Sequence, residues 1–292
     1  MEQINKHIEK YENYQSLAEY NIQLIGELDY PFTFDDVRTL STCGEWLFFK
    51  NDNGEYKLHS ANFCRKRYCL ICQWRKAEKQ FSHCVQLADY LQEQGYRFLH
   101  LVLTVPNCER SALSATVKRL FESFGRFYSY KDIKKAFKGC LRCLEVSYNY
   151  TNKTFHPHLH CLVAVNKSYF TDSKIYLSHE RLCALWSLAN KTDRYLQLSV
   201  GTIKDNLGFA EVSKYCVKPL ELSPLYDEDN KIILTELATT LKGTRFLQSY
   251  GVIRQALKEL KLTDDEEAPS LDSEQMFVYH FNRASGKYDL TI

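Results

Sequence analysis

The stretch FHPHLHCLVAV, residues 155–165, places histidines in a segment whose other residues are typical of a buried strand. In a strand, successive side chains point to opposite faces, so His158 and His160 share one face while the apolar residues next to them lie on the other. Imidazole nitrogens are common ligands of divalent metal ions, and a strand fixes the distance between two of them. The pattern therefore predicts two metal ligands on one face of a sheet, with two surface histidines as the alternative.

A carboxylate on the preceding segment can complete such a site. The runs LRCLEVSYNY (141–150) and HLHCLVAV (158–165) are separated by a polar stretch, which predicts a hairpin. If its turn is centred near residues 152–153, Glu145 lies roughly opposite His160, and opposed residues project to the same side. A carboxylate on this weakly polar face needs a cation or a donor to offset its desolvation. We therefore expect Glu145 to be a third ligand, with a glutamate at a strand edge in water as the alternative.

The segments around this hairpin have the periodicity of a mixed domain. The run FLHLVLTV, residues 98–105, is apolar on both faces and suits a central strand. The remaining periodic segments predict helices over residues 109–128, 178–190 and 208–217 and a strand over residues 194–203. This order of elements predicts an α+β fold, an antiparallel sheet with helices on one face.

Two acidic or polar stretches, residues 221–230 and 263–274, divide the chain. We expect three parts: an N-terminal region over residues 1–80, a central domain over residues 81–220 and a helical C-terminal segment over residues 221–292. The N-terminal region should contain a hairpin over residues 45–60 and, near its end, a helix that begins at about Gln73.

The N-terminal region also contains a group of cysteines. Four of them follow the split spacing of a zinc ribbon: Cys43, Cys64, Cys69 and Cys72. A tetrahedral zinc site would stabilise a region that has little core of its own. The alternatives are four unrelated buried thiols, or His59 or His83 as a ligand if Cys43 is too distant.

The cysteine count and the lack of long apolar stretches indicate the compartment in which the protein is expected. Eleven cysteines are an odd count, and the N-terminus has no apolar signal region, so a reducing compartment is expected. No stretch approaches the roughly 20 consecutive apolar residues that cross a bilayer. We therefore expect a cytoplasmic protein with no membrane partner.

The net charge of +2 is too small to indicate a nucleic-acid binder, so any such affinity must arise from local patches. Aromatic residues alternate with cations over residues 63–79, and a second basic stretch runs from Lys118 to Lys138. The candidate DNA-binding residues of the first patch are Arg65, Lys66, Arg67, Arg75 and Lys76. Cations neutralise phosphates and aromatic rings stack on unpaired bases. The alternative for either patch is a solvated helix face.

The segment EVSKYCVKP, residues 211–219, carries a second set of reactive groups. In a helix, Glu211, Tyr215 and Lys218 lie on one face. A phenol beside a carboxylate and an ammonium is a plausible nucleophile set. Because the chain has twenty tyrosines, a tyrosine that only packs is the alternative.

Taken together, the ordered segments FLHLVLTVPN, HPHLHCLV and EVSKYCVKP, with FCRKRYCLICQWRKA ahead of them, resemble the plasmid rolling-circle replication initiator (Rep) proteins of the HUH endonuclease superfamily. The similarity runs from about Cys43 to Pro219, and KGTRFLQSYGVIRQALK is similar to the family's C-terminal helical segment. One departure is Leu70, because relatives often have proline after the second cysteine of the cluster.

The resemblance implies an HUH-type antiparallel sheet and a catalytic Mg²⁺ or Mn²⁺ ion. The ligands of this ion would be His158, His160 and, by analogy with HUH sites, Glu145. It also implies that Tyr215 is the nucleophile, that Glu211 activates water in the terminating step and that Lys218 belongs to the same motif.

The expected products are a 5′-phosphotyrosine and a free 3′-OH primer. The partners would be plasmid origin DNA, as duplex and as a hairpin single strand, and the host DNA polymerase of a bacterium. A host helicase is also implied, because the sequence has no phosphate-binding G-x-x-x-x-G-K-[ST] loop. The sequence leaves the oligomeric state open, a homodimer included.

Two other functions remain as alternatives. Another HUH enzyme, a transposase or a mobilisation relaxase, would use the same site for strand transfer. A non-enzymatic zinc-dependent DNA-binding regulator would use the histidines and Tyr215 only structurally, and would bind DNA without nicking it.

Overall fold

The computed structural model of the protein describes residues 2–52, 54–204, 209, 222, 224–262 and 276–291. The chain forms two compact units. The cysteine unit comprises residues 1–76, 219–239 and 264–292, and the histidine unit comprises residues 77–218 and 240–263. The cysteine unit is therefore assembled from separate segments, and most of the histidine unit lies between them in the sequence.

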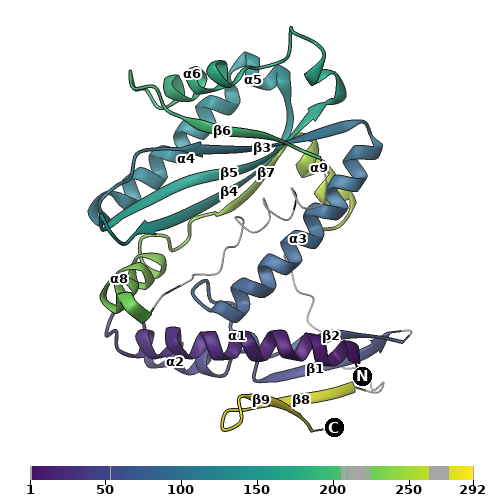
Figure 1. The fold of residues 1–292 in the computed structure, drawn as a ribbon, viewed down its shortest axis with the longest axis vertical. Helices are drawn as coiled ribbons and strands as arrows, with labels where there is room; N and C mark the ends of the chain where they lie inside the picture. Colours follow the sequence, from purple (N-terminus) through teal and green to yellow (C-terminus); the bar gives the residue numbers. More distant parts are fainter. Residues whose placement is uncertain are drawn as a thin grey trace. The chain divides into compact units, whose positions relative to one another are not determined.

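The histidine unit is built on a five-stranded antiparallel sheet with the order β6-β3-β5-β4-β7 (Figure 1). Its strands are β3 (Tyr96–Thr104), β4 (Phe137–Asn149), β5 (Thr154–Asn166), β6 (Leu198–Ile203) and β7 (Leu247–Tyr250). β4 and β5 are the predicted hairpin. In its turn, Oδ1 of Asn149 accepts hydrogen bonds from the backbone N–H groups of Thr151 and Asn152, at 3.0 and 2.9 Å. The predicted α+β antiparallel fold is confirmed.

Helices pack on both faces of this sheet, whereas the sequence predicted helices on one face. The helices of the unit are α3 (Leu70–Glu93), α4 (Leu113–Ser129), α5 (Lys131–Ala136), α6 (His179–Ala189) and α9 (Gly251–Glu259). α4 and α6 contact one face, where Phe127 and Trp186 pack edge to face with ring centroids 5.7 Å apart. α3 and α9 pack on the other face, in a buried cluster that includes Leu87, Leu141 and Ile253. α9 comes from the C-terminal segment, so its docking has no local signal in the sequence.

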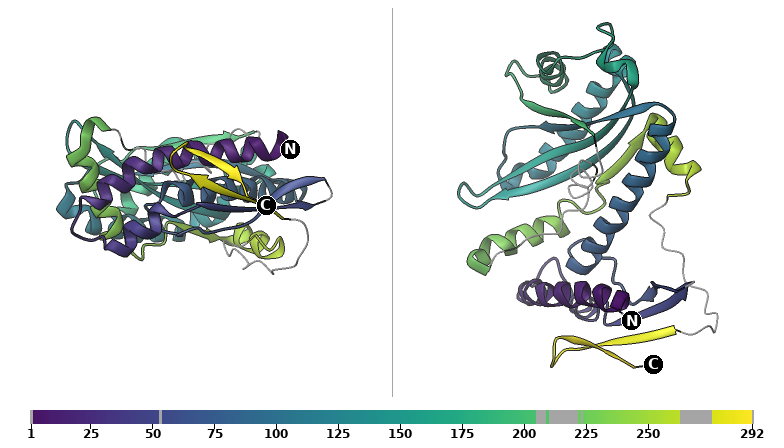
Figure 2. Two further views of the ribbon diagram at one scale, coloured as in Figure 1. Left: turned by 90° about the horizontal axis from the view of Figure 1, so that it is seen from below. Right: turned by 45° about the vertical axis from the view of Figure 1, so that its right-hand side comes forward.

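The cysteine unit has a four-stranded sheet with the order β2-β1-β8-β9, in which strands of residues 46–61 pair with strands of residues 276–290 (Figure 2). Its strands are β1 (Trp46–Asp52), β2 (Glu55–Ala61), β8 (Met276–Asn282) and β9 (Lys287–Leu290). The helices α1 (Glu2–Gly26), α2 (Phe34–Ser41) and α8 (Asp227–Ala238) complete the unit, together with the first turns of α3. The hydroxyl of Tyr288 in β9 donates a 2.5 Å hydrogen bond to the carbonyl of Gly44, next to Cys43.

The C-terminal segment contains the helices α8 and α9 and, in addition, three strands. Both β7 and β8 join sheets that begin much earlier in the chain: Ser249 pairs with Leu141, and Tyr279 pairs with Leu47. The helix expected over residues 208–217 lies outside the described residues, apart from Phe209. In the described ranges, no helix is both long and apolar enough to cross a membrane.

Candidate functional site

Glu145, His158 and His160 meet on one face of the sheet in the histidine unit. Glu145 pairs directly with His158, and His160 pairs with Cys143. This register differs by two residues from the expected one, in which Glu145 faced His160. The difference arises because the turn is centred between residues 151 and 152, one residue earlier than expected. A shift of two residues preserves the alternation of faces, so all three side chains still project to the same side.

The donor atoms of these residues have the spacing of metal ligands. One ligand atom from each residue lies within 4.8 Å of the others. Oε2 of Glu145 is 3.1 Å from Nε2 of His158 and 2.9 Å from Nε2 of His160. Octahedral bonds of about 2.1 Å, as Mg²⁺ forms, place adjacent ligand atoms about 3.0 Å apart. Two imidazole nitrogens and a carboxylate oxygen at this spacing can therefore hold a divalent cation.

The hydrogen bonding of His158 shows why a cation suits this position. Its Nδ1 lies 3.0 Å from the carbonyl oxygen of His156, and a carbonyl oxygen can only accept. In a neutral ring the proton is therefore on Nδ1, and Nε2 directs its lone pair at the carboxylate of Glu145. A lone pair facing a carboxylate oxygen is repulsive, so a cation or a proton between the two atoms is required.

The ionisation state of Glu145 also indicates that this site requires a positive charge. Burial would raise the pKa of its carboxyl group, but hydrogen bonds and charge from His158 and His160 outweigh burial and lower the pKa to about 2. The carboxylate is thus ionised at neutral pH, although its side chain is only 11% exposed. An ionised carboxylate with so little access to water needs a nearby positive charge, which His158 and His160 supply when they are protonated and which a bound metal ion would supply in place of those protons.

Sequence reasoning missed two residues that hold this site. Nε2 of His100, on β3, lies 3.0 Å from Nδ1 of His160. Asn107, which follows β3, accepts a hydrogen bond from Nδ1 of His156 at 2.7 Å. The available signal was parity, because pairing of Val102 with His160 puts His100 on the same face as the ligands.

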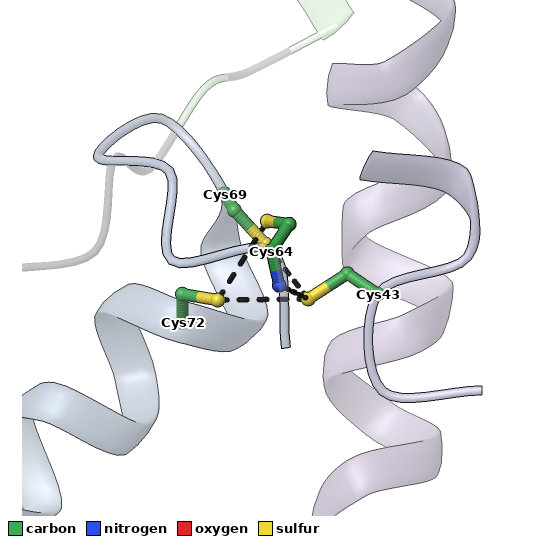
Figure 3. A group of neighbouring side chains, drawn as sticks. All are labelled: Cys43, Cys64, Cys69 and Cys72. Atoms are coloured by element: carbon green, nitrogen blue, oxygen red, sulfur yellow. Dashed lines mark hydrogen bonds between the residues drawn. The ribbon is translucent and has the colours of Figure 1, made fainter. Parts of the chain in front are cut away.

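The four cysteines predicted to bind zinc converge in the cysteine unit (Figure 3). The sulfur of Cys43 lies 3.5 Å from those of Cys69 and Cys72, and the sulfurs of Cys64 and Cys72 are 3.7 Å apart. Tetrahedral zinc with bonds of about 2.3 Å places its sulfur ligands about 3.8 Å apart. The set therefore fits zinc, and it needs no histidine as a substitute ligand.

The local backbone directs N–H groups at these sulfurs. The N–H of Cys64 donates to the sulfur of Cys43 at 3.4 Å, and that of Arg65 donates to the sulfur of Cys72 at 3.2 Å. Arg65 and Gly44 have φ values of 57° and 71°, the left-handed conformation that tight turns around a metal ligand require. Hydrogen bonds among the four thiols lower the pKa of Cys64 far below its usual value and raise that of Cys43, so in the metal-free cluster Cys64 is the favoured thiolate and accepts hydrogen bonds from its neighbours.

The five cations of the first basic patch differ in their surroundings. Arg65 and Lys76 are exposed, and the other three are half-buried. The ammonium of Lys66 contacts a carboxylate of α2. The guanidinium carbon of Arg75 lies 3.6 Å from the centroid of the Phe63 ring. The two exposed cations are thus the ones most accessible to phosphate.

The second basic stretch, from Lys118 to Lys138, lies on α4, on α5 and at the start of β4. Arg126 donates a 2.6 Å hydrogen bond to the carbonyl of Ala189 and so joins α4 to the end of α6. Lys135 donates to the carbonyl of Lys174 at 2.9 Å. Arg126 and Lys135 therefore make hydrogen bonds within the fold.

Glu211, Tyr215 and Lys218 lie outside the described residues. The described part of the candidate site is the group formed by Glu145, His158 and His160.

Most of the chain is similar in sequence to known proteins. The sequence model of the family described as "Replication protein" matches residues 55–282. "Protein rep" of Streptococcus pneumoniae serotype 2 is 33% identical over 250 residues, which cover 82% of this chain and 76% of that protein. "Protein rep" of Staphylococcus aureus is 32% identical over 220 residues, or 74% of this chain and 93% of that protein. No solved structure matches the chain significantly.

Proposed function

The chain belongs to the replication protein (Rep) family of plasmid replication initiators, and from that premise we propose that it starts rolling-circle replication by nicking one DNA strand at a plasmid origin. The observation that carries this proposal is the convergence of Glu145, His158 and His160 on one face of a sheet. In a protein that only bound DNA, this carboxylate between two imidazoles would have to serve a purely structural role.

Glu145, His158 and His160 would hold a Mg²⁺ or Mn²⁺ ion. When bound, the ion polarises the scissile phosphate and stabilises the charge that develops on its oxygens. The chain supplies rigidity: β5 fixes the spacing of the imidazoles, and the carbonyl of His156 keeps Nε2 of His158 directed at the site.

Tyr215 is the proposed nucleophile. Its phenolate oxygen forms a bond to phosphorus while the bond from phosphorus to the 3′ oxygen breaks, and that oxygen takes up a proton to become a 3′-OH. The 5′ end stays attached to the tyrosine, and host polymerase extends the 3′ end. In the terminating step, Glu211 would take a proton from the water molecule that makes the second cut, and Lys218 would offset negative charge.

We assign separate tasks to the parts of the chain. Residues 81–220 would nick the strand, and residues 1–80 would hold duplex DNA through the zinc site and the basic patch. Residues 221–292 contribute elements to both units. The partners would be the origin, as duplex and as a hairpin single strand, and host helicase and polymerase in a bacterial cytoplasm; a homodimer is compatible with this scheme.

The test is to incubate the protein with supercoiled plasmid that carries a candidate origin, in the presence of Mn²⁺. We expect relaxed circles with protein attached to the 5′ end. Tyr215→Phe should abolish this adduct while origin binding stays nearly unchanged, and an adduct that survives would remove Tyr215 from its role. Glu211→Ala should nick normally but fail to terminate, which would produce multimeric single strands.

The same assay separates the alternatives. Metal-dependent binding of DNA with no nicking would indicate a regulator. Cleavage of the ends of a mobile element, in preference to a hairpin origin, would indicate a transposase.

A further inference from the structure

We propose that His100 is a positioning residue for the metal ligand His160, because its Nε2 accepts a hydrogen bond from the Nδ1–H of His160 and so leaves the Nε2 lone pair of His160 directed at the metal. This inference rests on the proposed metal site at Glu145, His158 and His160. His100 is not among the ligands, so it would act only through the ring of His160.

The sheet brings the two rings together. Val102 pairs with His160 across β3 and β5, and His100 pairs with Leu162, so His100 is the diagonal neighbour of His160 on the same face. The rings stack with centroids 5.3 Å apart and planes 24° apart. Nε2 of His100 lies 3.0 Å from Nδ1 of His160, the distance of a hydrogen bond.

The number of protons on the two rings determines whether His100 or His160 donates this hydrogen bond. A neutral imidazole carries one proton, so a His160 that binds metal through Nε2 must carry its proton on Nδ1. The Nε2 of His100 must then be the acceptor. In the opposite arrangement His100 donates, Nε2 of His160 carries the proton and points it at Oε2 of Glu145, 2.9 Å away, and the site cannot bind metal.

The two ligand histidines are therefore held differently. The carbonyl oxygen of His156 only accepts, so it always keeps the proton of a neutral His158 on Nδ1. His100 can donate or accept, which allows the metal-free and the metal-bound arrangements of His160 with the same ring positions. The pair would thus lower the cost of emptying and filling the site without moving the sheet.

His100 is half-buried and adjoins the core cluster that contains Phe98 and Leu162. Truncation to alanine would combine loss of the acceptor with loss of packing. The informative comparison is between His100→Gln, which keeps an acceptor, and His100→Leu, which keeps bulk and lacks one. His179→Leu is the matched control, since His179 is also in this unit and its Nε2 donates to a backbone carbonyl, that of Leu198, at 2.9 Å.

The experiment measures Mn²⁺ affinity of the full-length protein by the electron paramagnetic resonance signal of free Mn²⁺. We expect His100→Leu to weaken binding about 10- to 100-fold, the usual effect of losing a partner of a metal-bound histidine. His100→Gln should restore most of the affinity, and His179→Leu should match the wild type. Thermal unfolding of the metal-free variants checks that each one is folded.

The outcomes distinguish failure of the proposed role of His100 from failure of the proposed metal site. Wild-type protein that binds Mn²⁺ while His100→Leu binds within twofold of it would overturn the role of His100 and leave the metal site intact. Equal weakening in His100→Leu and His100→Gln would show that the imidazole acts by shape, which also overturns the role. Wild-type protein that binds no Mn²⁺ would end both the inference and the proposed metal site.

Discussion

Glu145 and His158 are paired residues on β4 and β5, and Oε2 of the carboxylate lies 3.1 Å from Nε2 of the imidazole. Neither atom carries a proton when Glu145 is ionised and His158 is neutral. The contact therefore requires a positive charge, and this requirement leads to the first prediction.

Glu145→Gln should weaken Mn²⁺ binding at least about tenfold, because the amide keeps one oxygen ligand but removes the negative charge that the cation balances. The metal-free fold should change little, since the glutamine can still accept and donate hydrogen bonds at this position. Calorimetric titration with Mn²⁺ measures the change. Glu180→Gln, an exposed residue of α6, is the control. Unchanged affinity in Glu145→Gln would remove this residue from the ligand set.

Some features of this site follow from the sequence. Alternation of faces placed His158 and His160 together without any knowledge of the strand partners, and parity also placed Glu145 on their side. The exact pairing could not be predicted, because it depends on where the turn closes, and a shift of one residue in the turn centre moves the register by two. His100 was missed because it reaches the site across the sheet, from a strand about 60 residues away in the sequence.

The cysteine site was predictable from spacing alone, but its surroundings were not. Tyr288, which anchors the loop beside Cys43, lies 244 positions from its acceptor Gly44. Long-range pairing of this kind leaves no periodic signal in the sequence. Leu70, the departure from the family's usual proline, is the first residue of α3. Proline is tolerated at the first turn of a helix, so this position accommodates either residue.

Removal of zinc should unfold the cysteine unit. Because the four sulfurs lie together inside a small unit, metal binding contributes directly to its folding free energy. We expect Cys72→Ser to reduce the zinc content, measured by atomic absorption, and to lower the unfolding temperature. Cys108→Ser is the control, because Cys108 is a half-buried free cysteine outside the cluster. Full zinc content in Cys72→Ser would contradict the assignment.

Asp36 should stabilise the cysteine unit in a pH-dependent way. Burial alone would raise the pKa of its carboxyl group, but hydrogen bonds from Lys66, Thr33 and Tyr68 outweigh burial and lower the pKa far below its usual value. A lowered pKa in the folded state means that the stabilisation is complete above the ordinary aspartate pKa of about 3.9, starts to decrease below that value, and is lost only when the pH falls through the lowered pKa.

Asp36→Asn should therefore destabilise the protein by about 1–3 kcal/mol at pH 7, from loss of an N-cap partner and of charge-assisted hydrogen bonds. The difference from the wild type should shrink as the pH falls below about 4. Urea unfolding at pH 7 and pH 3 measures both values. Asp35→Asn, the exposed neighbour paired with Arg38, should have a small effect at either pH. Because the folded-state pKa lies well below 3, the difference at pH 3 should be smaller than at pH 7 but still present, and an equal difference at both pH values would contradict the linkage.

DNA binding by the cysteine unit should depend most on the exposed cations of its basic patch, residues 63–79. Arg65 and Lys76 are exposed, whereas Lys66 is already engaged by Asp36, so the first two are the better candidates for phosphate contacts. Each phosphate contact contributes about −0.9 to the slope of log affinity against log salt on duplex DNA.

The double variant Arg65→Ala, Lys76→Ala should therefore make this slope shallower by about 2, measured by fluorescence anisotropy with duplex origin DNA at several salt concentrations. The control is Lys6→Ala, Lys57→Ala, which removes the same charge from exposed positions of the same unit outside the basic patch. If both double variants change the slope equally, the protein is responding to net charge. If neither double variant changes the slope, the basic patch does not contact phosphate. The residues that bind duplex DNA would then lie on the histidine unit.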